Sequence, residues 1–339
     1  MQVDNGGTTA RQPVVTVIIP YYQREAGILS RALASVFMQG YEPAPTVLVI
    51  DDASPLAARD EVAGLTAEQA ARVVVFRQEN AGPGAARNRG LDSLGADTDY
   101  VAFLDSDDTW LPGHLARAVA ALEAGHDFYF SNYRDIGSAE GGFEARQHFD
   151  VRAHEPVPGL PDVRRYGGNL RDAILVACPV ETSTVVFRRS AIGAHRFRGE
   201  FRYAYEDLMY WFDLAGPETS IVFSPVVGTQ YGEGVNIYRA AEGSTMGRLR
   251  VTVGSTMFGA GVRRAHRLTA SQAAAVKARL ARNRTEIASH ILHRLRRRQS
   301  CLVPELRAYV RAYPASCVLL PIEVAGRAVR WLTGRADNP

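Results

Sequence analysis

Residues 46–52 read TVLVIDD: five apolar or β-branched residues run without interruption into two aspartates. A short apolar run of this kind is typical of a strand that is buried on both faces of a sheet. The pattern recurs, and we predict strands over residues 14–19, 46–50, 73–76 and 100–104. The first of them is expected to end at Pro20, and the fourth runs into Asp105.

Helical patterns separate these strands. Residues 24–39 carry apolar side chains at helical spacing and are followed by Gly40, a common residue after the last turn of a helix. A weaker helix is expected over residues 56–70, and another near residues 84–95. This alternation predicts right-handed βαβ crossovers, and therefore an α/β fold with a mostly parallel sheet flanked by helices.

The rest of the chain changes character at about residue 245. Residues 138–170 are rich in glycine, proline and charge, so we expect a long irregular insertion there. Further elements are expected as a strand near residues 185–187 and helices near residues 205–215, 273–280, 287–295 and 318–332. We therefore predict an α/β domain over residues 13–245 and a helical, arginine-rich C-terminal region over residues 246–339.

Composition narrows the class of protein. Of the 339 residues, 46% are hydrophobic and 22% are charged, which allows a sizeable core and excludes a disordered or fibrous chain. The three cysteines form no CxxC pair, which argues against a zinc finger, an iron–sulfur centre or a disulfide scaffold and fits a reducing cytoplasm. No secretory signal or membrane-spanning run is visible. We expect a cytoplasmic protein that is soluble or peripheral on the inner face of the cell membrane.

Charge is distributed unevenly along the chain. Residues 1–245 contain 21 basic and 32 acidic side chains, whereas residues 246–339 contain 18 basic and 4 acidic ones. The run HILHRLRRR at residues 290–298, with Trp331 and Arg335, has two open interpretations: contact with an anionic inner leaflet, or a solvated helical face. No recognised nucleic-acid motif accompanies the charge, so no nucleic-acid partner is expected.

Acidic residues follow the predicted strands, at the edge where α/β sheets bind their ligands. Asp105, Ser106 and Asp107 form a D-x-D motif whose two carboxylates can both reach a divalent cation, and oxygen ligands favour Mg²⁺ or Mn²⁺. The alternative is a polar turn. Asp108 adds a third carboxylate within four residues, and the mutual repulsion of the three favours a bound cation.

Two other strand ends have both a functional and a structural interpretation. A carboxylate at Asp51 or Asp52 can accept hydrogen bonds from a base or a ribose. Alternatively, Asp52 or Ser54 can cap the following helix, and we expect one of the two aspartates to be structural. GPGAARNRG at residues 82–90 opens a helix whose N-terminus favours an anion, with Arg87 available to a phosphate. The chain has neither a P-loop nor a G-x-G-x-x-G after the first strand, which argues against P-loop NTPases and dinucleotide-dependent hydride transfer.

Glu206 and Asp207 stand at the start of an aromatic helix. Acids in a first turn are ordinarily partners of the helix dipole, and the second interpretation is a catalytic base. The neighbouring aromatic residues suit the core or a cleft wall that stacks on a sugar ring: Tyr203, Tyr205, Tyr210 and Trp211.

Five motifs now share one order and spacing: VTVIIPYYQRE, VLVIDDASP, ENAGPGAARNRGL, VAFLDSDDTW and YEDLMYWFDL. Together they resemble the family 2 inverting glycosyltransferases with the GT-A fold, over about residues 13–245. IPYYQREAGILSRALASVF and GEGVNIYR resemble, more narrowly, rhizobial succinoglycan glucosyltransferases, which build exopolysaccharide repeats on a lipid carrier.

The resemblance implies a role for each matching residue. It places in the nucleotide pocket Pro20, Tyr22, Glu25 and either Asp51 or Asp52. It places Arg87 near the uracil or a phosphate, Asp105 with Ser106 near the ribose and the metal, and Asp107 on the metal. Asp207 becomes the general base with Glu206 beside it, and Arg239 reaches the diphosphate.

The implied reaction is the transfer of one sugar, expected to be glucose, from a UDP-sugar to a hydroxyl of a lipid-linked oligosaccharide, with inversion and with Mg²⁺ or Mn²⁺. Ala241 stands where the family often has a histidine, which leaves a third protein ligand of the metal open. It also gives weight to the alternative, a catalytically silent nucleotide-binding or scaffold protein of a polysaccharide assembly complex. The Q-x-x-R-W signature of processive synthases is absent, so single-sugar transfer is expected.

Overall fold

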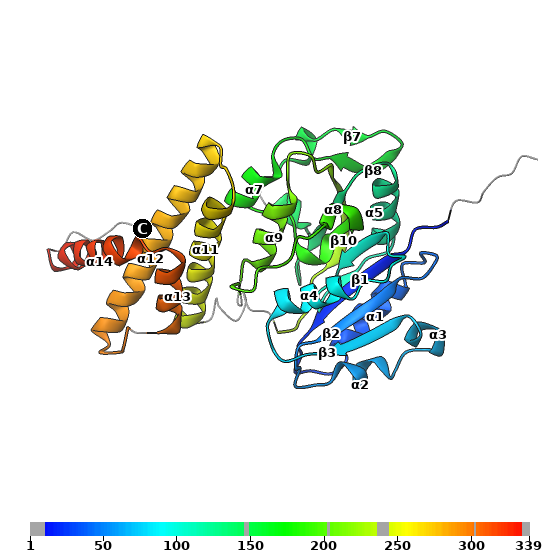
Figure 1. Ribbon diagram of the computed structural model, residues 1–339, viewed down its shortest axis with the longest axis horizontal. Coiled ribbons are helices and arrows are strands. Elements are labelled where there is room, and N and C mark those ends of the chain that lie inside the picture. The colour runs from blue at the N-terminus through cyan, green and yellow to red at the C-terminus, as the bar shows by residue number, and fades with distance from the viewer. Residues whose placement is uncertain (1–10, 146–148, 202–203, 236–243, 302, 334–339) are drawn as a thin grey trace, which may run out of the picture.

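The computed structural model describes residues 11–145, 149–201, 204–235, 244–301 and 303–333. Figure 1 shows a twisted sheet with helices on both faces, and a group of long helices packed against one side of it. The strands lie in the order β3 (Val73–Arg77), β2 (Thr46–Asp51), β1 (Val15–Tyr21), β4 (Tyr100–Phe103), β9 (Val186–Arg188), β6 (Phe128–Arg134), β10 (Ile221–Gln230), β8 (Leu160–Arg165) and β7 (Pro156–Val157). A short strand, β5 (Thr109–Trp110), pairs with β10.

The N-terminal half of the sheet is parallel, as predicted. β1 pairs in parallel with β2 and β4, and β2 pairs in parallel with β3. All of β1 is buried, because α1 (Ile28–Phe37) packs with Val17 on one face and α4 (Pro83–Asp92) packs with Ile18 on the other. The α/β fold with a mostly parallel sheet is confirmed. The prediction that the first strand ends at Pro20 is wrong: Pro20 pairs in register with Ile50, since a proline removes only the N–H donor of a ladder position.

The C-terminal half of the sheet is mixed. β6 and β10 are parallel, whereas β9 runs antiparallel between β4 and β6. The insertion predicted to be irregular contains α6 (Gly142–Ala145) and the hairpin β7–β8, which pairs antiparallel with β10. That prediction was wrong because LPDVRR in β8 buries only Val163 and shows no clean alternation.

The remaining helices extend the predicted pattern. The helix predicted over residues 56–70 is two helices, α2 (Ala58–Val62) and α3 (Ala67–Ala70). The stretches predicted at 273–280 and 287–295 belong to one helix, α12, which begins after a capping box of Thr269 and Gln272. The others are α5 (His114–Glu123), η1 (Val151–Ala153), α7 (Leu170–Val176), η2 (Thr182–Thr184), α8 (Arg189–Ile192), α9 (Glu206–Leu214), α11 (Thr245–Ala265), α12 (Ala270–Arg296), α13 (Pro304–Ala312) and α14 (Ser316–Leu332).

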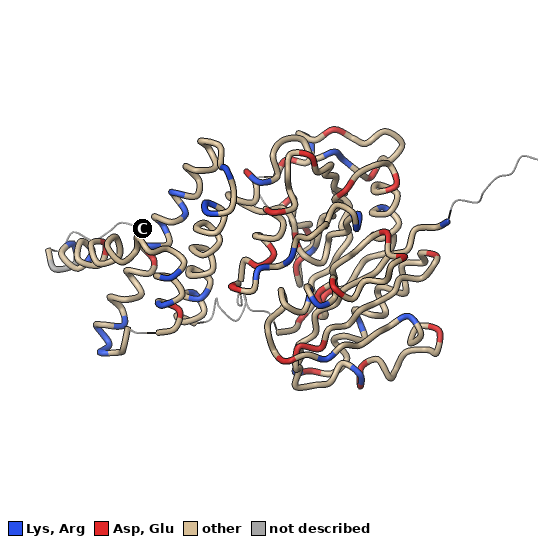
Figure 2. The backbone as a smooth tube through the Cα atoms, viewed as in Figure 1, with Lys and Arg blue, Asp and Glu red and all other residues tan. Residues whose placement is uncertain are grey.

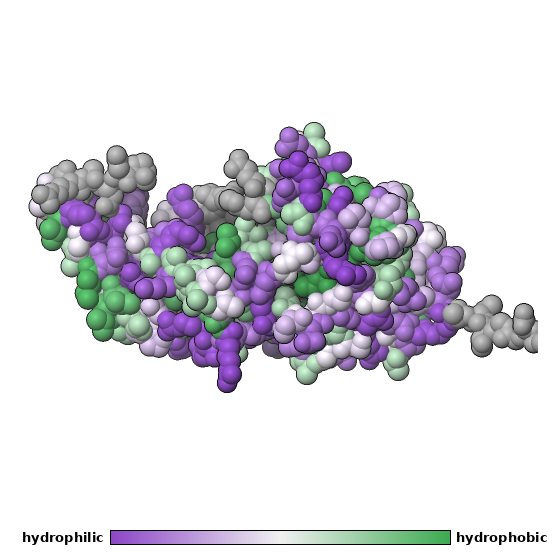
Figure 3. Space-filling view, turned by 90° about the horizontal axis from the view of Figure 1, so that it is seen from above, coloured by the Kyte–Doolittle hydropathy of each residue, from purple (hydrophilic) through white to green (hydrophobic). Residues whose placement is uncertain are grey.

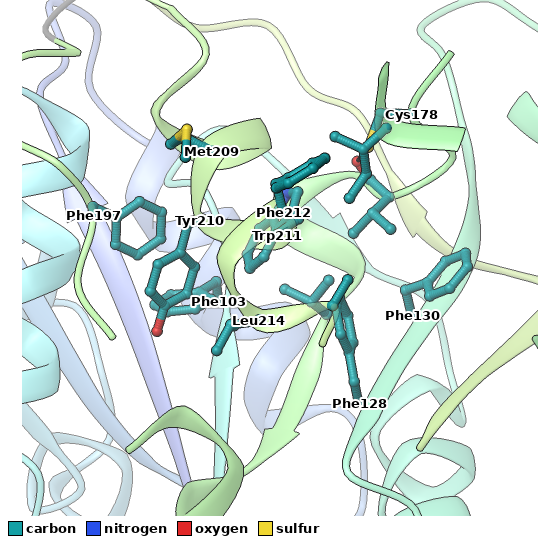
Figure 4. Packing of buried hydrophobic residues seen from close by; sticks show 14 of the residues in the cluster. Phe103, Phe128, Phe130, Cys178, Phe197, Met209, Tyr210, Trp211, Phe212 and Leu214 are labelled. Atoms are coloured by element: carbon teal, nitrogen blue, oxygen red, sulfur yellow. Dashed lines mark hydrogen bonds between the residues drawn. The ribbon is translucent and has the colours of Figure 1, made fainter. Parts of the chain in front are cut away.

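An aromatic core joins the sheet to the long helices. Trp211 of α9 stacks on Phe187 at a centroid distance of 5.5 Å, and its ring centroid lies 6.0 Å from that of Phe128. Figure 4 shows Trp211 and Phe128 among the buried side chains around α9. The same buried cluster continues into α11 through Phe258 and into α12 through Leu280. Burial of an aromatic or leucine side chain contributes about 1.5–3 kcal/mol, so this shared core holds α11 and α12 against α9.

Polar contacts reinforce that junction. His266 Nε2 lies 2.7 Å from Asp213 Oδ1, and Gln272 Nε2 donates to Asp172 Oδ1 at 2.7 Å. The division of the chain at residue 245 stays a prediction, since α11 and α12 share core residues with the sheet. Within the described ranges, the helices are all too short or too polar to cross a bilayer.

Candidate active site

A cavity of ≈ 1120 Å³ opens at the carboxyl ends of the parallel strands. It is lined by these residues predicted from the sequence: Pro20, Tyr22, Asp52, Arg87, Asp105, Ser106, Asp107, Glu206 and Asp207. Two other predicted residues do not line it: Glu25 is exposed and Asp51 is buried. A third, Arg239, lies outside the described residues. Their roles stay predictions. A smaller cavity of ≈ 600 Å³, lined in part by Asp99, Arg188 and Arg189, lies instead at the start of β4.

The loop from Asp105 to Asp108 is held by a serine that the sequence did not point to. Ser183, in the turn η2, accepts a hydrogen bond from the backbone N–H of Asp105 at 3.0 Å and donates to Asp108 Oδ2 at 2.5 Å. The backbone N–H of Gly232 donates to the other oxygen of Asp108. Burial, and then the charge of Asp107, raise the pKa of Asp108 well above its usual range. Asp108 therefore supports the loop through both of its carboxyl oxygens, although it also contributes to the lining of the cavity.

Asp105 and Asp107 are the two carboxylates that the sequence predicts for a metal, and both line the cavity. Asp105 keeps 34% of its side-chain surface exposed, and the chain beyond β10 packs directly on Asp107. A Cβ on Gly232 would overlap the carbonyl oxygen of Asp107, and one on Gly234 would come within 2.5 Å of its carboxylate. Mg²⁺ ordinarily takes one or two carboxylates together with substrate phosphates and water. The described residues contain no cluster of three or more histidine, cysteine or acidic side chains that could hold a metal ion.

Arg87 lies at the centre of the site, but its charge is already engaged. Its Nη2 lies 2.6 Å from Asp105 Oδ1, and its Nη1 lies 3.1 Å from Glu206 Oε1. Burial opposes the charged guanidinium, yet the charges of Asp105 and Glu206 outweigh burial and raise the pKa of Arg87. The side chain was predicted to pair with a phosphate or uracil; in the structure it joins the D-x-D loop to α9.

The first turn of α9 presents two carboxylates to the cavity. Tyr205 precedes them with a left-handed backbone, φ = 72°, and α11 approaches it closely because residue 254 is a glycine. Such a conformation costs about 1–3 kcal/mol in a residue with a side chain, and residues that keep it cluster at functional sites. Burial raises the pKa of Asp207 to about 6, against the opposing effect of Arg87. Burial and the charge of Asp207 raise the pKa of Glu206 to about 7.

The two aspartates at the end of β2 accept hydrogen bonds from backbone N–H groups. Asp51 accepts hydrogen bonds from the N–H groups of Ser54 and Ala58, so it supports the turn into α2. Asp52 accepts from the N–H groups of Ala81 and Gly82 while it lines the cavity. We expected one of the two aspartates to be structural, and both carboxylates make structural hydrogen bonds.

Part of the cavity wall comes from residues that the sequence did not single out. Glu181 and Tyr231 line it beside Asp207, and Val176 lines it at the end of α7 with 68% of its surface exposed. Arginines line it from the long helices: Arg250, Arg279 and Arg282. They lie in no motif and come together only because α11 and α12 fold back onto α7 and α9.

Solved structures share this architecture. The mannosyltransferase PcManGT from Pyrobaculum calidifontis, in complex with GDP-Man and Mn²⁺, has a TM-score of 0.55 and 16% identity, covering 96% of this chain and 89% of its own. Staphylococcus aureus TarS 1–349, in complex with UDP, has a TM-score of 0.53 and 17% identity, covering 93% and 87%. Such a likeness shows the fold alone, which is the GT-A fold of glycosyltransferases.

Sequence comparison defines the family. The profile described as Glycosyl transferase family 2 matches residues 16–193, more than half of the chain. The succinoglycan biosynthesis protein ExoW of Rhizobium meliloti (strain 1021) is 40% identical over 235 residues, which are 67% of this chain and 72% of ExoW. The chain therefore belongs to glycosyltransferase family 2, and the resemblance inferred from the five motifs is confirmed.

Proposed function

We propose that the chain transfers one glucose from UDP-glucose to a hydroxyl of a lipid-linked oligosaccharide in exopolysaccharide biosynthesis, with inversion at the anomeric carbon. The observation that carries the proposal is the convergence of Asp105, Asp107 and Asp207 on one cavity. The name of ExoW supports the pathway, and the UDP complex of TarS supports a uridine nucleotide as the donor.

Asp207 is proposed as the general base. It takes the proton of the acceptor hydroxyl while that oxygen forms a bond to the anomeric carbon. The bond from this carbon to the diphosphate oxygen breaks on the opposite face, and UDP leaves with the electron pair. Because burial raises its pKa only to about 6, Asp207 is ionised at neutral pH and remains a stronger base than an exposed aspartate.

Asp105 and Asp107 are proposed to hold Mg²⁺ or Mn²⁺ together with the donor diphosphate. A cation there neutralises the charge that develops on the leaving group. Arg87 keeps the carboxylate of Asp105 beside α9, because it forms one ion pair with Asp105 and another with Glu206. The Mn²⁺ complex of PcManGT supports the metal, and Ala241, the departure from the family pattern, lies outside the described residues.

The test is metal-dependent turnover. The full chain is incubated with Mn²⁺ and a panel of UDP-sugars, and sugar transfer to a lipid-linked oligosaccharide is followed by mass spectrometry and by NMR of the new linkage. We expect a β-linked product from UDP-glucose and its loss in Asp107→Asn. UDP binding with no hydrolysis or transfer from any UDP-sugar would instead establish the alternative, a silent nucleotide-binding or scaffold protein.

The helical region is proposed to contact the inner face of the cell membrane. On α14, Val318, Ile322 and Val329 are 65%, 64% and 57% exposed, and they lie on one face of the helix. Figure 3 shows hydrophobic residues gathered at the end of the molecule where this helix lies. Arg307 and Arg311 are exposed on the adjacent α13, and an apolar face bordered by arginines is typical of helices that lie in an anionic bilayer surface.

Vesicle flotation tests the membrane contact. The chain is expected to float with phosphatidylglycerol vesicles and not with phosphatidylcholine vesicles, and Ile322→Glu is expected to abolish flotation. Met38→Glu changes another exposed apolar residue, which directly follows α1 and is 74% exposed, and serves as the control. Flotation that is insensitive to Ile322→Glu would contradict a role for α14.

A further inference from the structure

The two walls of the cavity carry opposite charge. Carboxylates come from the strand ends and from α9, whereas the wall built by α11 and α12 contributes Arg250, Arg279 and Arg282. Figure 2 shows the same contrast on a larger scale, with basic residues prevailing over the long helices and acidic ones over the sheet. Helix α9 lies between these parts, since it contacts α11 and packs through Trp211 on Phe187 of the sheet (Figure 1).

Arg279 forms the rigid base of the basic wall. It is 7% exposed, and it donates to the carbonyl oxygen of Leu175 at 2.7 Å and to Ser255 Oγ at 3.1 Å. Its guanidinium lies 5.9 Å from the ring centroid of Tyr205, the residue that sets the start of α9. These contacts fix α12 against α9, the helix that carries Asp207. The exposed arginines beside Arg279 therefore keep a defined position relative to Asp207.

Arg282 and Arg250 carry the charge that faces the cavity. Arg282 follows Arg279 by three positions and so lies on the same face of α12; it is exposed, with no ion pair or hydrogen bond to the described residues. Glu286, one turn further on, accepts a hydrogen bond from Thr252 at 2.9 Å. Arg250 remains 44% exposed beside its partner Glu305. Arg250, Arg279 and Arg282 outnumber the two glutamates beside them, Glu286 and Glu305, so this wall keeps an excess of positive charge.

The geometry of in-line displacement indicates whether the donor or the acceptor contacts this wall of the cavity. The donor diphosphate is expected at Asp105 and Asp107, so the attacking hydroxyl must come from the opposite face of the donor sugar. Asp207 marks that face, and the wall beyond it is formed by α7, α11 and α12. The exposed Val176 and the ring of Tyr205 also line it, and they suit the apolar faces of sugar rings.

We infer that the acceptor is anionic, and that Arg282 and Arg250 bind its phosphate or carboxylate while Asp207 activates its hydroxyl. This inference rests on the proposed function and adds the charge of the acceptor. An exposed arginine that binds an oxyanion contributes through charge-assisted hydrogen bonds. The interaction strengthens acceptor binding, and added salt weakens it.

The test compares three acceptors that share one disaccharide: a neutral alkyl glycoside, the same glycoside ending in a uronic acid, and the disaccharide on farnesyl diphosphate. We expect a KM about tenfold lower for one of the anionic acceptors than for the neutral one. The ratio is expected to fall towards one in Arg282→Gln and with 0.5 M NaCl. Preference for the uronate places the charge on a sugar, and preference for the diphosphate places it on the lipid linkage.

Arg264→Gln is the matched control, because Arg264 is exposed on α11 outside the cavity lining; it should keep the wild-type ratio. Calorimetric binding of the two anionic acceptors in the presence of UDP gives a readout without turnover, and Arg282→Gln should weaken it about tenfold. Equal binding by wild type and Arg282→Gln, or no preference for an anionic acceptor, overturns the inference. Absence of hydrolysis and transfer with intact, Arg282-dependent binding overturns the proposed reaction alone.

Discussion

Arg87 and Glu206 stand 119 positions apart in the sequence, yet Nη1 of the arginine lies 3.1 Å from Oε1 of the glutamate. The second terminal nitrogen of the same guanidinium reaches Asp105. One buried side chain therefore couples the loop proposed to bind the metal with the helix that carries the proposed base. The position of each depends on the other.

Arg87→Met should destabilise the fold in a pH-dependent way. It leaves Asp105, Glu206 and Asp207 without their buried cation, and breaking a buried ion pair costs about 3–5 kcal/mol. The pKa values of Glu206 and Asp207, already raised by burial, should rise further without Arg87. At pH 8 both carboxylates are ionised, and these buried charges destabilise the folded state. This destabilisation disappears as the pH falls and the two carboxylates become protonated. Urea unfolding should therefore show a larger loss at pH 8 than at pH 5.

The control for that variant is Arg196→Met, which removes an ion pair to Asp92 at the surface. A surface pair contributes about 0–1 kcal/mol. If both variants lost the same free energy of unfolding, Arg87 would not be the buried junction described above.

Asp207→Asn should lower the activity of the enzyme and raise its thermal stability at pH 8. Loss of a general base lowers kcat about 10²–10⁴-fold. Burial raises the pKa of Asp207 to about 6, whereas an unfolded chain titrates near ~3.9. The folded state therefore holds the proton more tightly, and the stability from this group is full below about pH 4 and lost as the pH rises through about 6. The variant should melt at a higher temperature than wild type at pH 8 and at the same temperature near pH 4. Asp60→Asn, an exposed aspartate of α2, should change neither quantity.

The activity of the wild-type enzyme should follow the ionised fraction of Asp207. Because burial raises the pKa of Asp207 to about 6, kcat/KM should fall about tenfold per pH unit below that value and level off above it. Initial rates from pH 4.5 to 8.5, in buffers that do not bind Mn²⁺, give the profile. A profile that is flat across pH 6 would exclude Asp207 as the base.

The parallel half of the fold was predictable because three of its strands, β1, β2 and β4, are buried on both faces. Runs such as VVTVIIP need no partner to be recognised, and the acids after them mark the ligand edge of the sheet. The hairpin β7–β8 was missed because Val163 is its one buried position in β8. A strand with a single buried residue has no alternation of apolar and polar residues, so its sequence does not identify it as a strand.

The site was predictable where the chemistry lies in local motifs. Asp105, Asp107 and Asp207 were predicted from strand ends, a helix start and the family resemblance. All three line the cavity, and their roles stay predictions. Ser183 and Arg282 were missed because each reaches the site through tertiary placement. Ser183 lies in the short turn between α7 and β9, and Arg282 lies on a long helix with several other arginines. No local signal separates them from their neighbours.

Ser183→Ala should weaken metal binding more than catalysis. The hydroxyl holds both the backbone of Asp105 and the carboxyl of Asp108, so its removal leaves buried polar groups unpaired at a cost of about 1–3 kcal/mol. The Mn²⁺ concentration for half-maximal activity should rise about tenfold, with most of kcat restored at saturating Mn²⁺. Ser190→Ala, an exposed serine of α8, should leave the Mn²⁺ titration unchanged. Equal titrations for both variants would remove Ser183 from the metal site.

Gly232→Ala should disable the metal site without unfolding the chain. A Cβ at this position would overlap the carbonyl oxygen of Asp107. Because the overlapping atom belongs to the backbone, it cannot move aside as easily as the end of a flexible side chain. The displacement should move Asp107 away from Asp105 and break the hydrogen bond from Gly232 to Asp108. Metal-dependent hydrolysis of UDP-glucose should then fall by at least about 10²-fold, while circular dichroism retains the wild-type spectrum. Gly199→Ala places a methyl group in open space, so it should leave hydrolysis intact. Full activity of Gly232→Ala would mean that Asp107 does not need the position the structure gives it, and the assignment of this aspartate to the metal would fail.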